Sequence, residues 1–129
     1  MTTWRWLSKD AVAAMHAEQL AEHGGSPGVR DEGLLESALA RPLNQAADGE
    51  PTITELAAAY AFGIARNHPF IDGNKRTAFV GAATFLAVNG YEMTASEPEV
   101  VTTILKLAEG SLTDVALAAW FAANSRPQR

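Results

Sequence analysis

The sequence contains no cysteine, and this absence excludes several kinds of site. Without thiols the chain has no disulfide framework, no thiol nucleophile and no zinc–thiolate centre, so nothing ties it to an oxidising compartment. It also lacks an uncharged apolar run of about 20 residues, which a membrane-spanning helix requires. Residues 1–9 lack the apolar stretch of a secretory signal. We therefore expect a cytoplasmic protein that is not embedded in a membrane.

Positive charge is also scarce. The chain has 10 Lys and Arg residues against 15 Asp and Glu residues, which gives a formal net charge of −5 at pH 7. Proteins that coat nucleic acids neutralise many phosphates, so this charge balance argues against direct nucleic-acid binding. We accordingly assign Trp4, Trp6 and Trp120 to packing rather than to base stacking. Any phosphate that the protein binds must meet a local cluster of basic residues.

Apolar residues, in contrast, are abundant. They make up 47% of the 129 residues, which is ample material for one hydrophobic core. The sequence shows no internal repeat, no low-complexity tract and no linker long enough to separate domains. We therefore expect residues 1–129 to form one domain.

Helical patterns dominate the chain and predict an all-α fold of about six helices. Ser8 is a candidate N-cap for a helix over residues 9–23, which the glycine-rich stretch 24–28 ends. Asp31 can cap a second helix, and we expect that helix to stop at Arg41 because Pro42 disfavours continuation. Residues 44–51 then form an exposed loop.

Two uncharged stretches, residues 56–65 and 77–88, are apolar around the whole helical circumference and predict two buried central helices. After them, residues 91–94 fit a short extended piece, as residues 3–7 fit a short strand or extended arm. Ser96 with Glu99, and Ser111 with Asp114, each have capping-box spacing. These pairs predict two further helices, the last ending near Asn124.

The segment Asn67-His68-Pro69-Phe70-Ile71-Asp72-Gly73-Asn74-Lys75-Arg76-Thr77 connects the two central helices. We expect Asp72 to cap the second of them, which leaves the first backbone N–H groups of that helix free to bind an anion. Gly73 allows a ligand to approach the backbone closely. Lys75 and Arg76 are unfavourable at a helix start because the macrodipole favours acids there, so we infer that a bound anion compensates.

Other side chains of the segment suggest chemistry. His68 can take a proton near neutral pH, and Asp72 offers a hard oxygen ligand for a Mg²⁺ ion that is bound to phosphates. Asn74 can donate to a phosphate oxygen. Pro69 and Phe70 are interpreted as structural residues.

Three residues near the segment or upstream of it are harder to place. Arg66 either reaches the phosphates or pairs elsewhere. His16 and His23 have no acidic or histidine partner at metal-ligand spacing, so we interpret both as surface residues.

The segment is not a Walker A loop, because the first glycine of that motif is missing.

The run from His68 to Thr77 resembles the signature of the Fic/Doc superfamily, and its lysine variant is similar to that of the Doc (death-on-curing) toxins. The resemblance extends to residues 28–31, 34–42 and 86–91. It implies the helical Fic/Doc fold, in which the active-site loop lies between two central buried helices. It also implies catalytic roles for His68 as general base and Asp72 as Mg²⁺ ligand, with nucleotide phosphates bound by Gly73, Asn74, Lys75 and Arg76.

Two positions choose between the reactions of the superfamily. Fic AMP-transferases have glycine at the position of Lys75 and arginine at that of Phe79. The resemblance therefore implies the Doc reaction, in which the γ-phosphate of ATP moves to a threonine of a target protein. Doc itself has alanine at the position of Gly73 and differs at Pro69.

The resemblance further implies a toxin that inhibits translation by modifying elongation factor Tu, with a Phd-like antitoxin whose disordered tail folds on the toxin. Two other functions stay open. One is a Fic-type nucleotidyl transferase that modifies a protein hydroxyl. The other is a non-catalytic regulator that acts together with an antitoxin.

Overall fold

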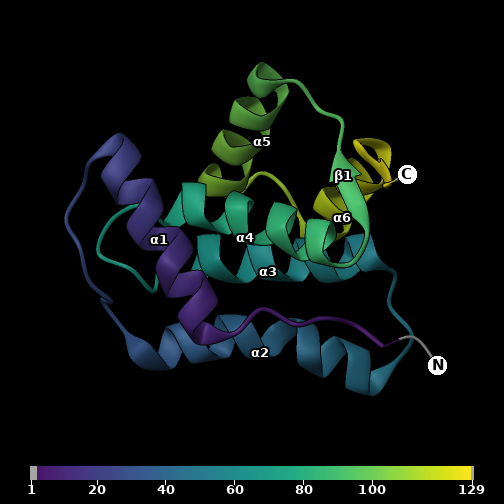
Figure 1. Cartoon of the computed structure of the whole chain (residues 1–129), viewed down its shortest axis with the longest axis horizontal. Helices are drawn as coiled ribbons and strands as arrows, with labels where there is room; N and C mark the ends of the chain where they lie inside the picture. Colours follow the sequence, from purple (N-terminus) through teal and green to yellow (C-terminus); the bar gives the residue numbers. More distant parts are fainter. Residues whose placement is uncertain (1–2, 129) are drawn as a thin grey trace.

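The computed structural model of the chain describes residues 3–128. Over these residues it forms six helices and one small antiparallel sheet (Figure 1), which confirms the expected all-α architecture. The elements are α1 (Lys9–His23), α2 (Glu32–Asp48), α3 (Ile53–Asn67), α4 (Asn74–Val88), β1 (Tyr91–Met93), α5 (Glu97–Glu109), α6 (Asp114–Ala123) and β2 (Ser125–Pro127).

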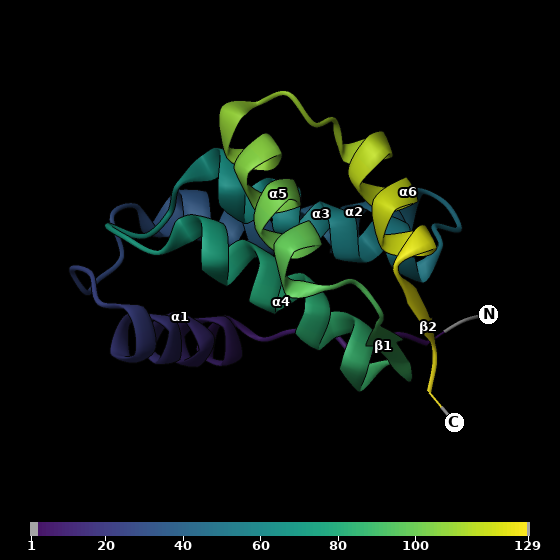
Figure 2. The same ribbon diagram turned by 90° about the horizontal axis from the view of Figure 1, so that it is seen from above.

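Helices α3 and α4 pack against each other at the centre of the molecule, as predicted for the two uncharged stretches. Helices α2 and α6 pack against α3, and α1 packs against α4 (Figures 1 and 2). Leu56, Tyr60 and Ile64 of α3 are fully buried, and Phe85 and Leu86 of α4 are too. The two helices with the most buried residues therefore hold the segment between them.

Helix α2 corrects one prediction, because it runs through Pro42 and ends only at Asp48. Proline inside a helix removes one backbone hydrogen bond, and this loss usually ends the helix. Here the ring of Pro42 is fully buried, so its apolar contacts offset the loss. The nearby backbone is also close-packed: a Cβ on Gly63 of α3 would lie 3.2 Å from the carbonyl oxygen of Ala38. The predicted loop over residues 44–51 is correspondingly shorter.

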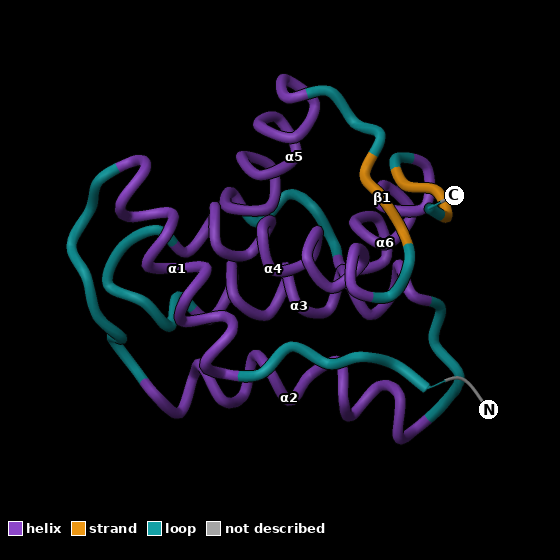
Figure 3. Tube along the Cα trace, viewed as in Figure 1, coloured by secondary structure: helices purple, strands orange, loops and turns teal. Residues whose placement is uncertain are grey.

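The described part of the N-terminal segment is an extended arm without a strand partner, as Figure 3 shows. The side chain of Asn89 replaces that partner, because its Oδ1 accepts from the Arg5 N–H and its Nδ2 donates to the Arg5 carbonyl. Trp4 and Trp6 pack their rings against Phe85, which confirms their structural role. Strand β1 covers the predicted extended piece and pairs with β2.

The predicted caps are confirmed at Ser8, Asp31 and Ser96, where each side chain accepts a backbone N–H of the first turn. The prediction for Ser111 is wrong. Helix α6 is capped by Thr113, whose hydroxyl accepts the N–H of Ala116. The Ser111 hydroxyl instead donates to the carbonyl of Lys106. Among residues 3–128, no helix combines the length and the apolar character needed to cross a membrane.

Candidate active site

The loop between α3 and α4, residues 68–73, begins in a strained conformation. His68 is the C-cap of α3, with φ 49° and ψ 54°, and it is the one non-glycine residue with positive φ among residues 3–128. Helix C-caps in this left-handed conformation are usually glycine or asparagine, and another residue there costs about 1–3 kcal/mol. In this conformation the exposed side chain of His68 lies at the start of the loop, directly after α3.

Arg30 fixes this turn from the loop between α1 and α2. Its Nε–H donates to the His68 carbonyl at 2.7 Å, and its Nη2–H donates to the Asn67 carbonyl at 2.9 Å. These carbonyls lie at the negative end of α3, where a cation is favourable. Arg30 therefore supports the strained backbone of His68 and satisfies two carbonyl groups at the end of α3.

The backbone of the α1–α2 loop pairs with the next residues. The Pro69 carbonyl accepts the N–H groups of Arg30 and Asp31 at 2.7 and 3.1 Å, and the Ile71 N–H donates to the Gly28 carbonyl at 3.1 Å. The two segments thereby form a short antiparallel bridge. Pro69 and Phe70 are buried, and these contacts agree with the structural role predicted for both.

Asn74 closes the loop from the inside. Its buried side chain accepts the Phe70 N–H and donates to the Phe70 carbonyl, both at 2.9 Å. This arrangement corrects the expectation that the Asn74 amide faces a phosphate, because both ends of the amide are engaged with the backbone. Only the backbone N–H of Asn74 remains at the helix start.

His16 corrects a second expectation, since it is only 5% exposed rather than a surface residue. Its imidazole stacks on the ring of Phe70, with centroids 3.8 Å apart and planes 10° apart. Its Nε2 lies 2.7 Å from the carbonyl oxygen of Asp72. The sequence pattern of α1 shows no trace of this contact, because both partners come from distant parts of the chain.

Asp72 is not the cap of α4, in contrast to the prediction. The N-cap is Gly73, with φ 78° and no side-chain hydrogen bond to the helix. Instead, the Asp72 Oδ2 accepts the backbone N–H of Ser26 at 2.9 Å. The two segments of the chain approach closely here, because a Cβ on Gly25 would lie 3.3 Å from the Asp72 Cβ. The exposed carboxylate is thus held at the surface beside the helix start.

The first turn of α4 therefore has no capping side chain and no acidic residue. The initial N–H groups of a helix have no intrahelical partners, so this turn presents unsatisfied donors and positive potential. Lys75 and Arg76 are exposed there, and neither forms a salt bridge within residues 3–128. Both features suit an anion such as a phosphate group.

Two hollows adjoin this turn, each of about 320 Å³. Their linings share Asp72, Gly73 and Arg76. The first also includes His68 and Lys75, so it brings together the predicted base, the carboxylate and the basic turn. The second lies towards the end of α1, where the exposed His23 is among its lining residues.

The residues present fit a Mg²⁺ ion that arrives with a nucleotide. Within residues 3–128, no three Asp, Glu or His side chains gather as a metal-binding cluster. Mg²⁺ bound to phosphates commonly uses only one or two carboxylates and takes its other ligands from phosphate oxygens and water. A single exposed carboxylate, Asp72, beside the basic first turn of α4 is compatible with a Mg²⁺ site that uses one carboxylate.

Arg66 lies apart from these groups. Its guanidinium packs over the ring of Phe62, at 5.2 Å from the centroid, and its Nη1 is near Gly110. It does not line either hollow at the α4 start. The structure thus places Arg66 on the side of α3 that faces the end of α5, rather than with Lys75 and Arg76.

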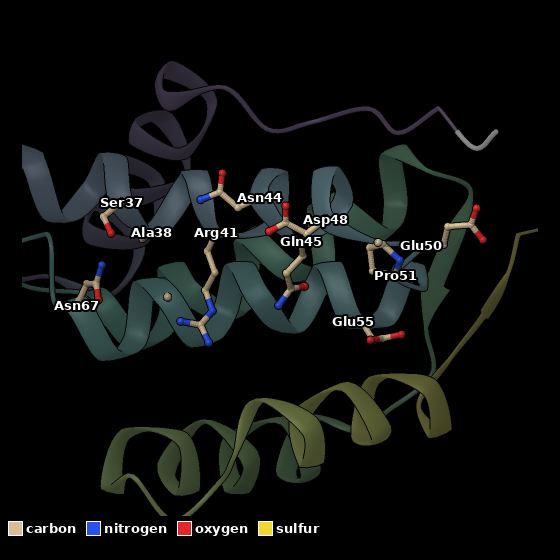
Figure 4. Close-up of a pocket in the computed structure, with 12 residues that line it drawn as sticks. Ser37, Ala38, Arg41, Asn44, Gln45, Asp48, Glu50, Pro51, Glu55 and Asn67 are labelled. Carbon is tan, nitrogen blue, oxygen red and sulfur yellow. The ribbon is translucent and has the colours of Figure 1, made fainter.

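A larger cavity of about 750 Å³ lies between α2 and α3 (Figure 4). Arg41 reaches across it from α2 and pairs with Asp114 of α6 at 3.2 Å. Of the predicted segment, only Asn67 lines this cavity, and its Nδ2 donates to the Leu34 carbonyl. Size alone therefore does not identify the candidate active site, and the chemistry favours the smaller hollows.

Sequence reasoning missed three contributors to the site, namely His16, Ser26 and Arg30. They contact the loop across 56, 46 and 38 residues of sequence. The glycine-rich stretch before Arg30 gave one signal, since several glycines indicate a backbone that must adopt unusual angles or approach another segment closely. The family resemblance over residues 28–31 included Arg30 but assigned it no role. Gly25 and Gly28 both have positive φ.

The sequence is similar to known proteins of one family, and the similarity includes the α3–α4 loop. The family model described as Fic/DOC family matches residues 6–86, a range that contains α1 to α3, the whole loop and all but the last two residues of α4. The chain is 34% identical over 110 residues to a protein named "Protein kinase doc" from Escherichia phage P1, covering 84% of this chain and 86% of that protein.

A second relative, "Toxin Doc" from Mycolicibacterium smegmatis, is 47% identical over 74 residues. The match covers 56% of this chain and 57% of that protein, so it spans little more than half the length of either. Together with the family match over residues 6–86, these similarities show that the chain belongs to the Fic/Doc family.

Proposed function

We propose that this protein is a Doc-type toxin that acts as a protein kinase, transferring the γ-phosphate of ATP to a hydroxyl group of a bacterial protein. The observation that carries the proposal is the uncapped, basic first turn of α4 beside a histidine held in a strained conformation. The names of the two relatives support a toxin with kinase activity.

Phosphoryl transfer needs little covalent chemistry from the protein, but it needs alignment and charge stabilisation. His68 accepts the proton of the target hydroxyl. The hydroxyl oxygen then bonds to the γ-phosphorus, and the bond from that phosphorus to the β–γ bridging oxygen breaks, so ADP leaves. Asp72 would hold the Mg²⁺ ion that arrives with the nucleotide, and this ion would neutralise charge on the phosphates. Lys75, Arg76 and the N–H groups at the α4 start stabilise the negative charge of the transition state.

Lys75 favours this reaction over nucleotidyl transfer. It is exposed on the first turn of α4 and lines the same hollow as His68. The AMP-transferases that the segment resembles have glycine at this position, which leaves room for the inner phosphates of the nucleotide. Phe79, at the position of their second arginine, packs on Phe121 and Trp120 and provides no charge.

We further propose that the target residue is a threonine of elongation factor Tu and that the partner is a Phd-like antitoxin. Phosphorylation of a translation factor would explain growth arrest by a toxin. A disordered antitoxin tail that folds into a helix on the toxin is a usual mode of coupled folding and binding. Co-purification with the product of an adjacent short reading frame tests the partner.

The reaction is tested by incubating the purified protein with elongation factor Tu and ATP labelled at either the γ- or the α-phosphate. We expect label on the target only from γ-labelled ATP. His68→Ala should lower the transfer rate by about 10²–10⁴-fold, which is the usual contribution of a general base. Its thermal unfolding serves as the fold control.

Three outcomes contradict the proposal in different ways. Label from α-labelled ATP would indicate nucleotidyl transfer. An unchanged rate in His68→Ala would remove His68 as the base. Equal growth arrest by the wild type and by the double variant His68→Ala, Asp72→Ala would favour a non-catalytic regulator.

A further inference from the structure

His16 contacts the α3–α4 loop at Phe70 and Asp72, although it belongs to α1. The side chain is 5% exposed, and buried polar groups in folded proteins nearly always have a hydrogen-bond partner. The partner here is the carbonyl oxygen of Asp72 at 2.7 Å. Because a carbonyl oxygen can only accept, Nε2 of His16 carries the hydrogen.

The ring of His16 is held in place by packing. It stacks on Phe70 at 3.8 Å between centroids, and Phe70 itself is 1% exposed. A Cβ on Gly73 would lie 3.5 Å from the His16 Cδ2 and 3.6 Å from its Nε2. The imidazole therefore lies directly against the peptide group that joins Asp72 to Gly73.

The orientation of this peptide group has a consequence for the anion site. The bond is trans, because residues 3–128 contain no cis peptide bond, and in a trans peptide the carbonyl and the N–H point in opposite directions. When His16 holds the Asp72 carbonyl towards the interior, the N–H of Gly73 points away from His16. Gly73 lines both hollows at the start of α4, and these hollows adjoin the exposed basic first turn.

We propose that His16 is a positioning residue for phosphate binding: its Nε2–H fixes the Asp72–Gly73 peptide so that the Gly73 N–H is presented to the bound anion. The proposal rests on the phosphate-binding function proposed above. His16 itself touches neither substrate, and it acts only through the backbone of the loop. The stack on Phe70 fixes the position and plane of the His16 ring, and the hydrogen bond fixes the orientation of the Asp72–Gly73 peptide.

A pair of substitutions separates the hydrogen bond from the packing. His16→Phe keeps a flat ring against Phe70 but has no donor for the Asp72 carbonyl. His16→Gln loses the ring, but its amide nitrogen can reach the position of Nε2. Val12→Ala is the matched control, because Val12 is fully buried in the same helix and its truncation should loosen α1 while His16 keeps its hydrogen bond to the Asp72 carbonyl.

The measurement is the Kd of the full-length protein for Mg·ATP by calorimetry, together with KM for ATP and kcat for transfer to elongation factor Tu. We expect His16→Phe to raise Kd and KM for ATP about tenfold, the loss of one hydrogen bond to a charged group. We expect His16→Gln to restore most of the affinity, and Val12→Ala to leave it within about twofold. The KM for the target protein should not change in any variant.

Other results overturn the inference. If His16→Phe binds Mg·ATP as tightly as the wild type, His16 does not position the phosphate site. If affinity falls equally in His16→Phe, His16→Gln and Val12→Ala, the role of His16 is only to pack α1. If the wild type itself binds no nucleotide, the proposed function fails and this inference fails with it. If the wild type binds Mg·ATP and His16→Phe binds it equally tightly, only this inference fails.

Discussion

The inner and outer faces of the α3–α4 loop differ in how completely their polar groups are paired. On the inner face, the side chains of His16 and Asn74 bond the backbone of Asp72 and Phe70, and all of these contacts are buried or nearly so. On the outer face, His68, Lys75 and Arg76 are exposed and form no salt bridge within residues 3–128. The inner face therefore determines shape, and the outer face keeps its charges available for a ligand.

This contrast predicts opposite effects of substitution. Inner-face changes should lower stability and disturb binding indirectly. Outer-face changes should disturb binding directly, with little loss of stability or even a gain.

The largest effect is expected for Asn74→Ala on the inner face. It leaves both the N–H and the carbonyl of the buried Phe70 without their partner, and each unsatisfied buried group costs about 1–3 kcal/mol. We expect a loss of about 3 kcal/mol in unfolding free energy and a fall in Tm on the order of 10 °C, measured by denaturant and thermal unfolding. Asn44→Ala on the exposed face of α2 is the control, and equal Tm values for the two variants would refute this account.

Lys75→Met on the outer face should act in the opposite direction on stability. Removing a cation from a helix N-terminus should raise the unfolding free energy by about 0.3–1 kcal/mol, whereas loss of a charged phosphate contact should weaken Mg·ATP binding by about 1.5–3 kcal/mol. The control is Lys106→Met in the last turn of α5, where the cation is favourable. That variant should lose stability and keep its affinity for ATP, as unfolding and calorimetry can check.

Arg30→Gln tests the point at which the two faces meet. The variant loses the bonds to the carbonyls of Asn67 and His68, so the strained backbone of His68 loses its support. We expect a loss of about 1–2 kcal/mol in stability and a lower kcat with little change in the Kd for Mg·ATP. Arg5→Gln is the control, since the structure gives that exposed arginine a backbone contact only. An unchanged kcat in Arg30→Gln would show that His68 keeps its conformation unaided.

The smallest effect at neutral pH is expected for Tyr60, a buried residue of α3 outside the loop. Burial raises the pKa of Tyr60, although the hydrogen bond from the Leu7 N–H opposes the shift. Because the pKa of Tyr60 is raised in the folded state, the protonated hydroxyl favours that state. This stabilisation is complete below pH 10 and is lost as the pH rises through the folded-state pKa.

The wild type should therefore lose stability above pH 10 more steeply than Tyr60→Phe, as thermal unfolding between pH 8 and pH 11 can measure. Transfer activity at neutral pH should be the same in both. Parallel alkaline curves would show that Tyr60 ionises as it does in the unfolded chain.

Local sequence patterns predicted the elements of the fold well. Uncharged stretches predicted α3 and α4, and serine or aspartate at the helix starts predicted three caps. These features depend on residues three or four positions apart, which the sequence displays directly. The segment around His68 and Lys75 was found for the same reason, because its histidine, acid and bases all lie within residues 68–76.

The errors arose where distant residues decide the outcome. Pro42 remains inside α2 because burial of its ring offsets the lost hydrogen bond, and local propensity contains no information about that burial. Asp72 does not cap α4 because the Ser26 N–H engages its carboxylate. The sequence pattern indicates a surface position for His16, because the partners that bury it, Phe70 and Asp72, lie more than 50 residues away.

The bridge between the α1–α2 loop and residues 69–71 also has a consequence for how the protein acquires activity. Contacts this far apart in sequence form late in folding, because the intervening chain must close first. A peptide that contains only α3, α4 and their loop would lack Ser26 and Arg30, and with them the supports of Asp72 and His68. Release of α1 and its loop by local unfolding would therefore dismantle the site while the central helices stay packed.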